Sequence, residues 1–119
     1  MSEAASQGIR RYCLTLDLKD DPALIERYKD YHRPGNVWPE VTQSIRDAGV
    51  LKMEIYLLGN RLCMVMEVDE NFSFEAKAAA DRDNARVREW EELMDRFQEK
   101  LPWGQSGEKW LLMETIFSL

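Results

Sequence analysis

The sequence predicts an α+β fold, a ferredoxin-like βαββαβ sandwich, and three observations support this prediction. Segments with strand-like alternation and segments with helical periodicity follow one another as strand, helix in two pieces, strand, strand, helix and strand. A two-residue turn joins the two middle strands. The chain has 119 residues, which suits one domain. We expect residues 1–9 to be a flexible N-terminal segment and residues 10–119 to form a single domain.

The first strand is predicted over residues 11–18, where Tyr12, Leu14, Leu16 and Leu18 alternate with polar residues. The carboxylate of Asp21 and the proline that follows it are typical of a helix start. This helix must end at or near His32, because Pro34 excludes the helical conformation from the residue before it.

A second helical piece is predicted to begin at Pro39, to bury the stripe Val41, Ile45 and Ala48, and to close at Gly49. Residues 51–58 and 61–68 then alternate as two strands. The pair Gly59 and Asn60 between them is typical of a tight hairpin turn.

The last third of the chain is predicted as one long helix over residues 72–101, followed by a strand over residues 109–117. Pro102 and Gly104 stop the helix. Its buried stripe recurs at steps of three and four residues and consists of Val87, Trp90, Met94, Phe97 and Leu101.

Composition restricts the partners. There are 16 Lys and Arg against 22 Asp and Glu, a net charge of −6, so nucleic acid and anionic membranes are poor partners. No apolar run approaches the roughly 20 residues that span a bilayer, and the N-terminus lacks the pattern of a secretory signal. We therefore expect a cytoplasmic protein. Cys13 and Cys63 lie in strand-like sequence without metal-ligand spacing, which indicates reduced core residues.

In a ferredoxin-like sandwich the helices cover one face of the sheet and leave the other bare. A bare face that carries Leu, Met and aromatic residues would be a large exposed apolar patch. We therefore expect two subunits to bring their sheets together as a homodimer, a closed dimeric α+β barrel.

His32 is the only histidine, so proton transfer near neutral pH would most naturally involve it. Tyr28 precedes it by four residues, which places both side chains on one helix face. Carbonyl groups at the helix end would favour the protonated imidazole, a proton donor. A surface or capping role for a lone histidine remains open at this point.

Aromatic side chains near this pair suit a sugar site, because their faces stack on the C–H face of a pyranose. Trp38 could form such a wall, or it could simply pack the second helix onto the sheet. Tyr56 faces either the core or the open sheet face, and the spacing of Trp90 favours the core. The sequence has no phosphate loop, dinucleotide-binding glycine pattern, paired metal ligands or serine elbow.

These features together resemble the L-rhamnose mutarotase family. The resemblance extends from residue 11 to residue 119 and is carried by Tyr28 and His32, Trp38-Pro39-Glu40, Ile55-Tyr56-Leu57, Trp90 and the terminal Met113-Glu114-x-Ile116-Phe117. It implies an enzyme without a cofactor or metal that interconverts the α and β anomers of a 6-deoxyhexose such as L-rhamnose or L-fucose. It also implies that His32 is the proton donor and that Tyr28 contacts the sugar. The resemblance further implies that Trp38, Met53, Tyr56 and Trp90 bind the substrate.

The chain departs from the family pattern at two positions. Met53 stands where the rhamnose enzymes have a tyrosine, and Glu89 stands where they have the first of two adjacent tryptophans. Two further features, the additional Gly35-Asn36 and the distinctive Trp103 and Trp110, suggest a related specificity such as L-fucose.

Two other functions are compatible with this fold class. One is a non-catalytic dimeric barrel module that binds a small metabolite, and the other is a cofactor-free monooxygenase. A panel of aldoses, followed by exchange of the anomeric proton in NMR, would discriminate between these alternatives and a mutarotase.

Overall fold

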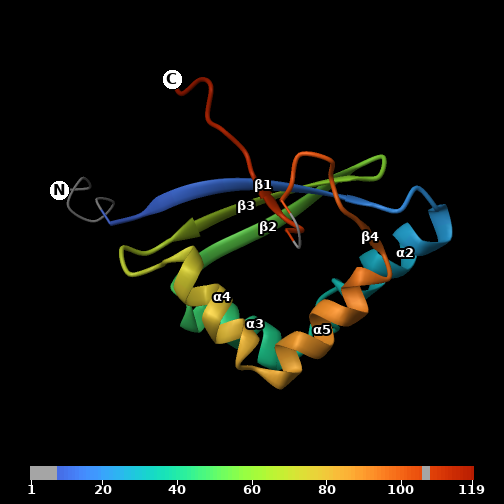
Figure 1. Ribbon diagram of the computed structural model, residues 1–119, viewed down its shortest axis with the longest axis horizontal. Coiled ribbons are helices and arrows are strands. Elements are labelled where there is room, and N and C mark those ends of the chain that lie inside the picture. Colours follow the sequence, from blue (N-terminus) through green and yellow to red (C-terminus); the bar gives the residue numbers. More distant parts are fainter. Residues whose placement is uncertain (1–7, 106–107) are drawn as a thin grey trace.

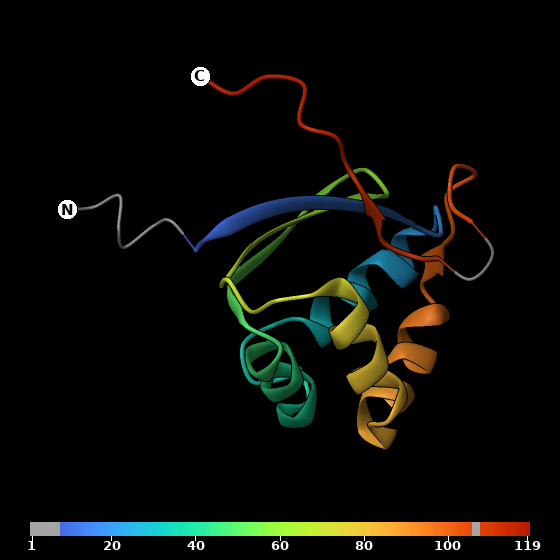
Figure 2. The ribbon, with the colours of Figure 1, turned by 60° about the vertical axis from the view of Figure 1, so that its left-hand side comes forward.

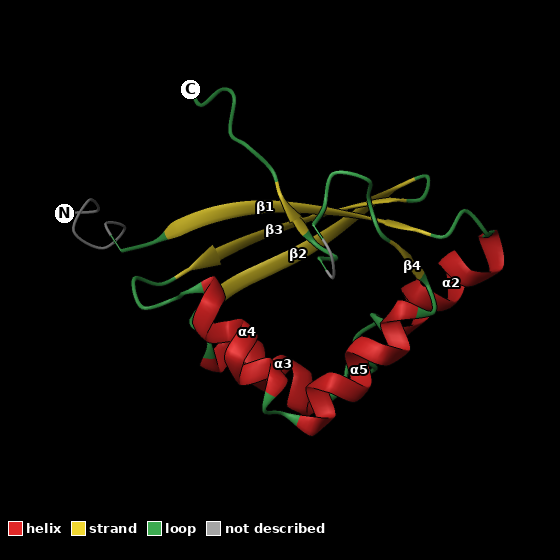
Figure 3. Cartoon of the chain, viewed as in Figure 1, coloured by secondary structure: helices red, strands yellow, loops and turns green. Residues whose placement is uncertain are grey.

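The computed structural model describes residues 8–105 and 108–119, and its elements follow the predicted order. Residues 1–7, most of the predicted flexible segment, lie outside the described residues. The elements are β1 (Arg10–Leu18), α2 (Pro22–Tyr31), α3 (Pro39–Asp47), β2 (Val50–Leu58), β3 (Arg61–Val68), α4 (Phe74–Arg82), α5 (Ala85–Asp95), β4 (Gln98–Glu99) and β5 (Leu111–Leu112). All four helices lie on one side of the sheet (Figures 1 and 3).

The sheet is antiparallel with the order β2-β3-β1-β4, and β5 also pairs with β1. β4 and β5 occupy the same edge of β1: Asp17 pairs with Glu99, and Thr15 pairs with Leu111. The chain between them leaves this edge and returns to it. The fourth strand of the ferredoxin-like pattern is therefore present as two short pieces, and β2 forms the opposite edge of the sheet.

The strand register separates two faces. Leu14, Leu16 and Leu18 point toward the helices and are at most 7% exposed. Because Leu14 pairs with Met64 and Met64 pairs with Ile55, these side chains share that face. The opposite face carries the alternate positions, among them Cys13 and Tyr56. As Figure 2 shows, the chain after β5 rises from the side of the sheet away from the helices.

Three predictions from the sequence are wrong in part. The long helix over residues 72–101 is two helices, because the side chain of Asn84 accepts hydrogen bonds from the backbone N–H groups of Arg86 and Val87 and starts a new helix. The helical spacing of apolar residues continues across this break, so the sequence pattern did not reveal it. The chain also leaves the helix after Asp95, where Phe97 accepts a backbone bond from Lys19 at 2.8 Å.

The last strand is shorter than predicted. Only Leu111–Leu112 pair, and the final backbone bond runs from Met113 N–H to the Cys13 carbonyl at 2.8 Å. The remaining residues alternate as a strand would but have no neighbouring strand, so their side chains stand in solvent, with Ile116 90% and Phe117 77% exposed.

The cysteines are free, as predicted, but they are not in the core. Both are partly exposed on the bare sheet face. Burial is the main effect that raises the pKa of the Cys63 thiol, and the neighbouring Cys13 adds to it. Within the described residues, no helix is long and apolar enough to cross a bilayer.

Candidate active site

The end of α2 positions the two predicted catalytic residues. Asp21 caps the start of the helix by accepting from the N–H groups of Ala23 and Leu24, and the helix ends at Tyr31 with His32 as its C-cap. His32 Nδ1 lies 2.7 Å from the Tyr28 carbonyl oxygen. Since a carbonyl only accepts, Nδ1 carries the hydrogen and donates it. Nε2 therefore carries the lone pair of the neutral ring.

The environment of His32 favours this neutral form. Burial lowers the pKa of the imidazole, and the hydrogen bond to the Tyr28 carbonyl opposes this shift but is the smaller effect. The sequence predicted the reverse, a protonated ring favoured by the carbonyl groups at the helix end. That prediction is wrong because the spacing showed the carbonyls but not the packing around the ring. At neutral pH the structure presents a base at His32.

Tyr28 is buried next to His32. Its side chain is 4% exposed, and the centroids of the two rings are 4.4 Å apart. Burial is the main effect that raises the pKa of Tyr28 to about 12, while a hydrogen bond from Gln98 lowers it. The Gln98 amide Nε2 donates to the phenol oxygen over 3.3 Å. The phenol therefore stays protonated at neutral pH, and its own hydrogen can be donated elsewhere.

A cavity of about 580 Å³ lies between the helices and the sheet and brings four predicted site residues together. Tyr28, His32, Met53 and Trp90 all line it. Trp90, on α5, is 7% exposed and meets the His32 ring edge to face at 5.6 Å. Its predicted place in the core and its place at the site are thus compatible, because a buried side chain of the core can also form part of the cavity wall. The volume and the mixed apolar and polar walls suit a small ligand.

Two predicted site residues lie elsewhere. Trp38 does not line the cavity, since its ring packs edge to face against Trp90 at 5.2 Å and lies under the Arg86 guanidinium at 4.0 Å. It thus supports Trp90 from outside the cavity. Tyr56 is on the bare sheet face, 55% exposed, and donates its hydroxyl hydrogen to Glu54 at 3.1 Å.

Sequence reasoning missed Gln98 as a site residue. It was expected inside the last helix, whereas the structure places it on β4 with its side chain in the cavity wall. No spacing signal could have found it, because its position depends on the pairing of β4 with β1. Trp110, noted in the sequence as distinctive, also lines the cavity, and the second distinctive tryptophan, Trp103, is 71% exposed.

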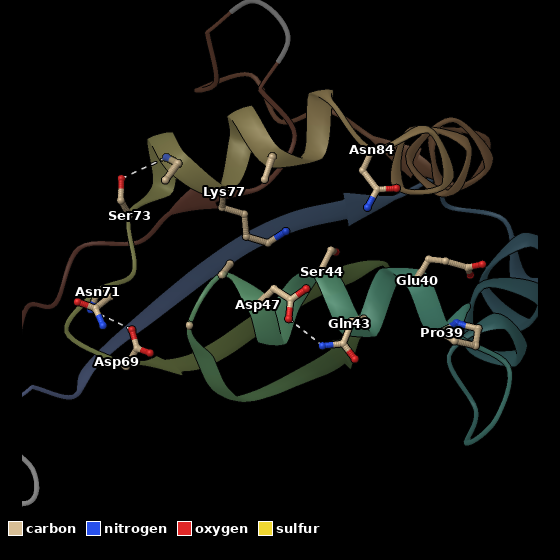
Figure 4. A pocket seen from close by; sticks show the side chains of 14 residues that line it. Pro39, Glu40, Gln43, Ser44, Asp47, Asp69, Asn71, Ser73, Lys77 and Asn84 are labelled. Carbon is tan, nitrogen blue, oxygen red and sulfur yellow. Dashed lines mark hydrogen bonds between the residues drawn. The ribbon is translucent and has the colours of Figure 1, made fainter.

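A larger cavity of about 900 Å³ lies between α3 and α4 (Figure 4). Its lining has neither an aromatic ring nor a histidine. Several of its polar side chains already serve the local backbone or one another: Asp69 accepts from the Asn71 N–H, Ser73 caps α4, and Gln43 donates to Asp47. We therefore place the candidate site in the smaller cavity. Within residues 8–105 and 108–119, no three His, Cys, Asp or Glu side chains are arranged to hold a metal ion.

Comparison with known proteins identifies the family. Residues 11–119 match the family described as L-rhamnose mutarotase. The chain belongs to the L-rhamnose mutarotase family. It is similar to an L-fucose mutarotase of Xanthomonas campestris pv. campestris, with 48% identity over 112 residues that cover 94% of this chain and 90% of that protein. A UPF0734 protein of Dictyostelium discoideum is 37% identical over 114 residues, 92% of this chain and 90% of that protein.

A solved structure supports the fold. The crystal structure of an L-rhamnose mutarotase from Formosa agariphila superposes with a TM-score of 0.67 at 20% identity, over 92% of this chain and 98% of that one. The predicted α+β fold is therefore confirmed. Membership in the L-rhamnose mutarotase family also confirms the predicted enzyme class, an isomerase that acts on sugar anomers.

Proposed function

We propose that this member of the L-rhamnose mutarotase family interconverts the α and β anomers of L-fucose in the 580 Å³ cavity, without a cofactor. The observation that carries the proposal is the placement of Tyr28 and His32 next to each other on one cavity wall. The protonated phenol can donate a proton, and the neutral imidazole can accept one. The 48% identity to an L-fucose mutarotase supports the choice of sugar.

The cavity walls fit a deoxyhexose. The sheet side contributes apolar side chains, among them Met53, Ile55 and Met64, which suit the methyl group of a 6-deoxy sugar. The Trp90 ring offers a face or edge for the apolar side of a pyranose. Trp38 keeps Trp90 in position from behind, so we assign it a positioning role and not a contact with the sugar.

In the proposed mechanism His32 acts first as a base. Nε2 takes the proton from the anomeric hydroxyl while the bond between the anomeric carbon and the ring oxygen breaks. The ring oxygen receives a proton from the Tyr28 phenol, whose oxygen is held by Gln98. The freed aldehyde rotates about its bond to the next carbon. Closure on the other face returns the ring-oxygen proton to Tyr28 and the His32 proton to the anomeric oxygen.

This order differs from the donor-first role that the family resemblance implies for His32. It is the order that suits an imidazole whose pKa is lowered by burial and a phenol whose pKa is about 12. Both groups therefore have the required protonation state before the sugar binds: the imidazole is neutral and the phenol is protonated. Transfer of both protons in one step avoids a free alkoxide in a cavity of low polarity.

The test is exchange between anomers, measured by saturation-transfer NMR with L-fucose, L-rhamnose and other aldoses. We expect exchange above the buffer rate, fastest with L-fucose. His32→Ala should lower the rate about 10²- to 10⁴-fold, the usual contribution of a general acid or base. Arg82→Ala, on the outer surface of α4, is the matched control and should leave the rate unchanged. Exchange retained in His32→Ala would contradict the assignment.

We propose in addition that the enzyme is a homodimer formed by the bare sheet faces. Exposed apolar side chains on that face and on the C-terminal segment support this: Leu58 is 86%, Ile116 90% and Phe117 77% exposed. Tyr56 would then be an interface residue and not a sugar contact of its own subunit. The cytoplasmic location and the single domain over residues 10–119 stay predictions of the sequence.

A further inference from the structure

Among the described residues, one buried side-chain polar atom has no hydrogen-bond partner, the Oε1 oxygen of Gln98. Buried polar atoms in folded proteins nearly always have a partner, because an unpaired oxygen in an apolar environment costs free energy. An exception of this kind requires an explanation in the structure. Its location next to the candidate site supplies one.

The backbone fixes where Gln98 points. On β4 it pairs with Leu18 of β1, whose side chain is 1% exposed on the helix side of the sheet. Residues directly opposite each other in an antiparallel pair project to the same face. Gln98 accordingly extends toward the helices and lines the same cavity as Tyr28 and His32.

The other half of the Gln98 amide is already engaged. Nε2 donates to the Tyr28 hydroxyl oxygen over 3.3 Å, which orients the amide plane. The oxygen Oε1 can only accept, so the group that satisfies it must be a donor. A sugar brings several hydroxyl donors into this cavity, whereas the surrounding protein side chains supply none to Oε1.

We propose that Gln98 is a sugar-binding and specificity-determining residue: Oε1 accepts a hydrogen bond from one hydroxyl of the bound sugar, while Nε2 holds the Tyr28 phenol so that its hydrogen is donated into the cavity. This proposal rests on the proposed mutarotase function. A buried acceptor of this kind discriminates against sugars that lack the hydroxyl or carry it in the inverted orientation, because the acceptor is then left unpaired.

The experiment compares Gln98→Met, which keeps the length of the side chain but removes both amide groups, with the unmodified protein. We expect the KM for L-fucose exchange to rise about 3- to 10-fold, the effect of one neutral hydrogen bond. Monodeoxy analogues of L-fucose identify the hydroxyl. The unmodified enzyme should discriminate against the analogue that lacks it, and Gln98→Met should bind that analogue and L-fucose about equally well.

A second variant separates the two halves of the amide. Gln98→Glu retains an acceptor for the sugar but accepts the Tyr28 hydrogen in place of donating to its oxygen. We expect a fall in kcat with a smaller change in KM. The matched control is Gln43→Met, which removes the same amide from α3 outside the cavity and should change neither constant.

Direct contact between Gln98 and the sugar can be measured by ¹⁵N NMR. The side-chain amide resonances of Gln98 should shift when L-fucose is added to the unmodified protein. An unchanged KM in Gln98→Met together with unshifted resonances would overturn the proposal. If Gln98→Met fails to fold, the amide shift and Gln98→Glu decide the matter. Absence of exchange in the unmodified protein would instead refute the proposed function.

Discussion

At His32 two local effects oppose each other. The helix-end carbonyl that accepts from Nδ1 favours the protonated ring, and burial among aromatic side chains disfavours it. Burial is the larger effect, so the resting imidazole is neutral. The sequence could predict the first effect from a spacing of four residues but not the second, which depends on α5 packing against the end of α2 through Trp90.

The pH dependence of the rate follows from this shift. The pKa of His32 is lowered from 6.5. The imidazole is therefore a neutral base at every pH above this lowered pKa. We expect kcat/KM for anomer exchange to rise with pH through an apparent pKa below 6.5 and to stay level through neutral pH. Rates by NMR between pH 4.5 and 8 provide the measurement. A rate that falls as the pH rises through this range would support a protonated donor instead.

Met53 is the residue at which we expect specificity to be changed most simply. It lines the cavity from β2. The resemblance to the rhamnose enzymes implies a tyrosine at this position in those enzymes. Met53→Tyr adds a ring and a hydroxyl to this wall, so we expect kcat/KM to rise for L-rhamnose relative to L-fucose. The ratio of the two sugars is the measurement, since loss of folded protein lowers both alike. An unchanged ratio would show that specificity is set by other residues.

At the scale of helices and strands, the sequence predicted best those features that depend on neighbouring residues, such as turns and helix starts. The hairpin at Gly59-Asn60 and the start of α2 at Asp21-Pro22 are encoded by neighbouring residues, and both predictions are confirmed. What it missed depends on distant partners. β4 and β5 exist only because β1 offers them an edge, and the position of Gln98 in the cavity follows from that pairing.

The junction between α3 and β2 offers a stability test. Gly49 closes α3 with a φ of +99°, and a Cβ there would collide with the Asp69 carboxylate. Gly35 has a φ of +87° with open space around it. We expect Gly35→Ala to lower the free energy of unfolding by about 1–2 kcal/mol through backbone strain alone. Gly49→Ala should cost more, because strain and collision add.

The measurement is urea unfolding of both glycine variants at one protein concentration. The midpoints should fall in the order unmodified protein, Gly35→Ala and Gly49→Ala, with the slope m unchanged. Equal midpoints for the two variants would mean that the Asp69 side chain moves aside without cost, and that this junction is less rigid than its geometry indicates.

At the scale of the whole molecule, the two sheet faces have different roles. Four helices lie on the side of one face, which lines the candidate site, while the other face is bare and lies on the side from which the C-terminal segment projects (Figure 2). The register assigns Tyr56 and Leu58 to the bare face, so the pocket and the proposed interface share strands but not side chains. Assembly and sugar binding can therefore be perturbed separately.

A charge on the bare face tests the homodimer. Tyr56→Asp places a second carboxylate beside Glu54 on the bare face, and an unpaired charge buried at an interface costs several kcal/mol. The unmodified protein should elute at about twice the 14.0 kDa of one chain in size-exclusion chromatography with light scattering, and the variant near 14.0 kDa. Arg82→Asp, on the outer surface of the helices, should remain dimeric. If the unmodified protein measures 14.0 kDa, the bare face is not an interface between copies, and Tyr56 is simply exposed.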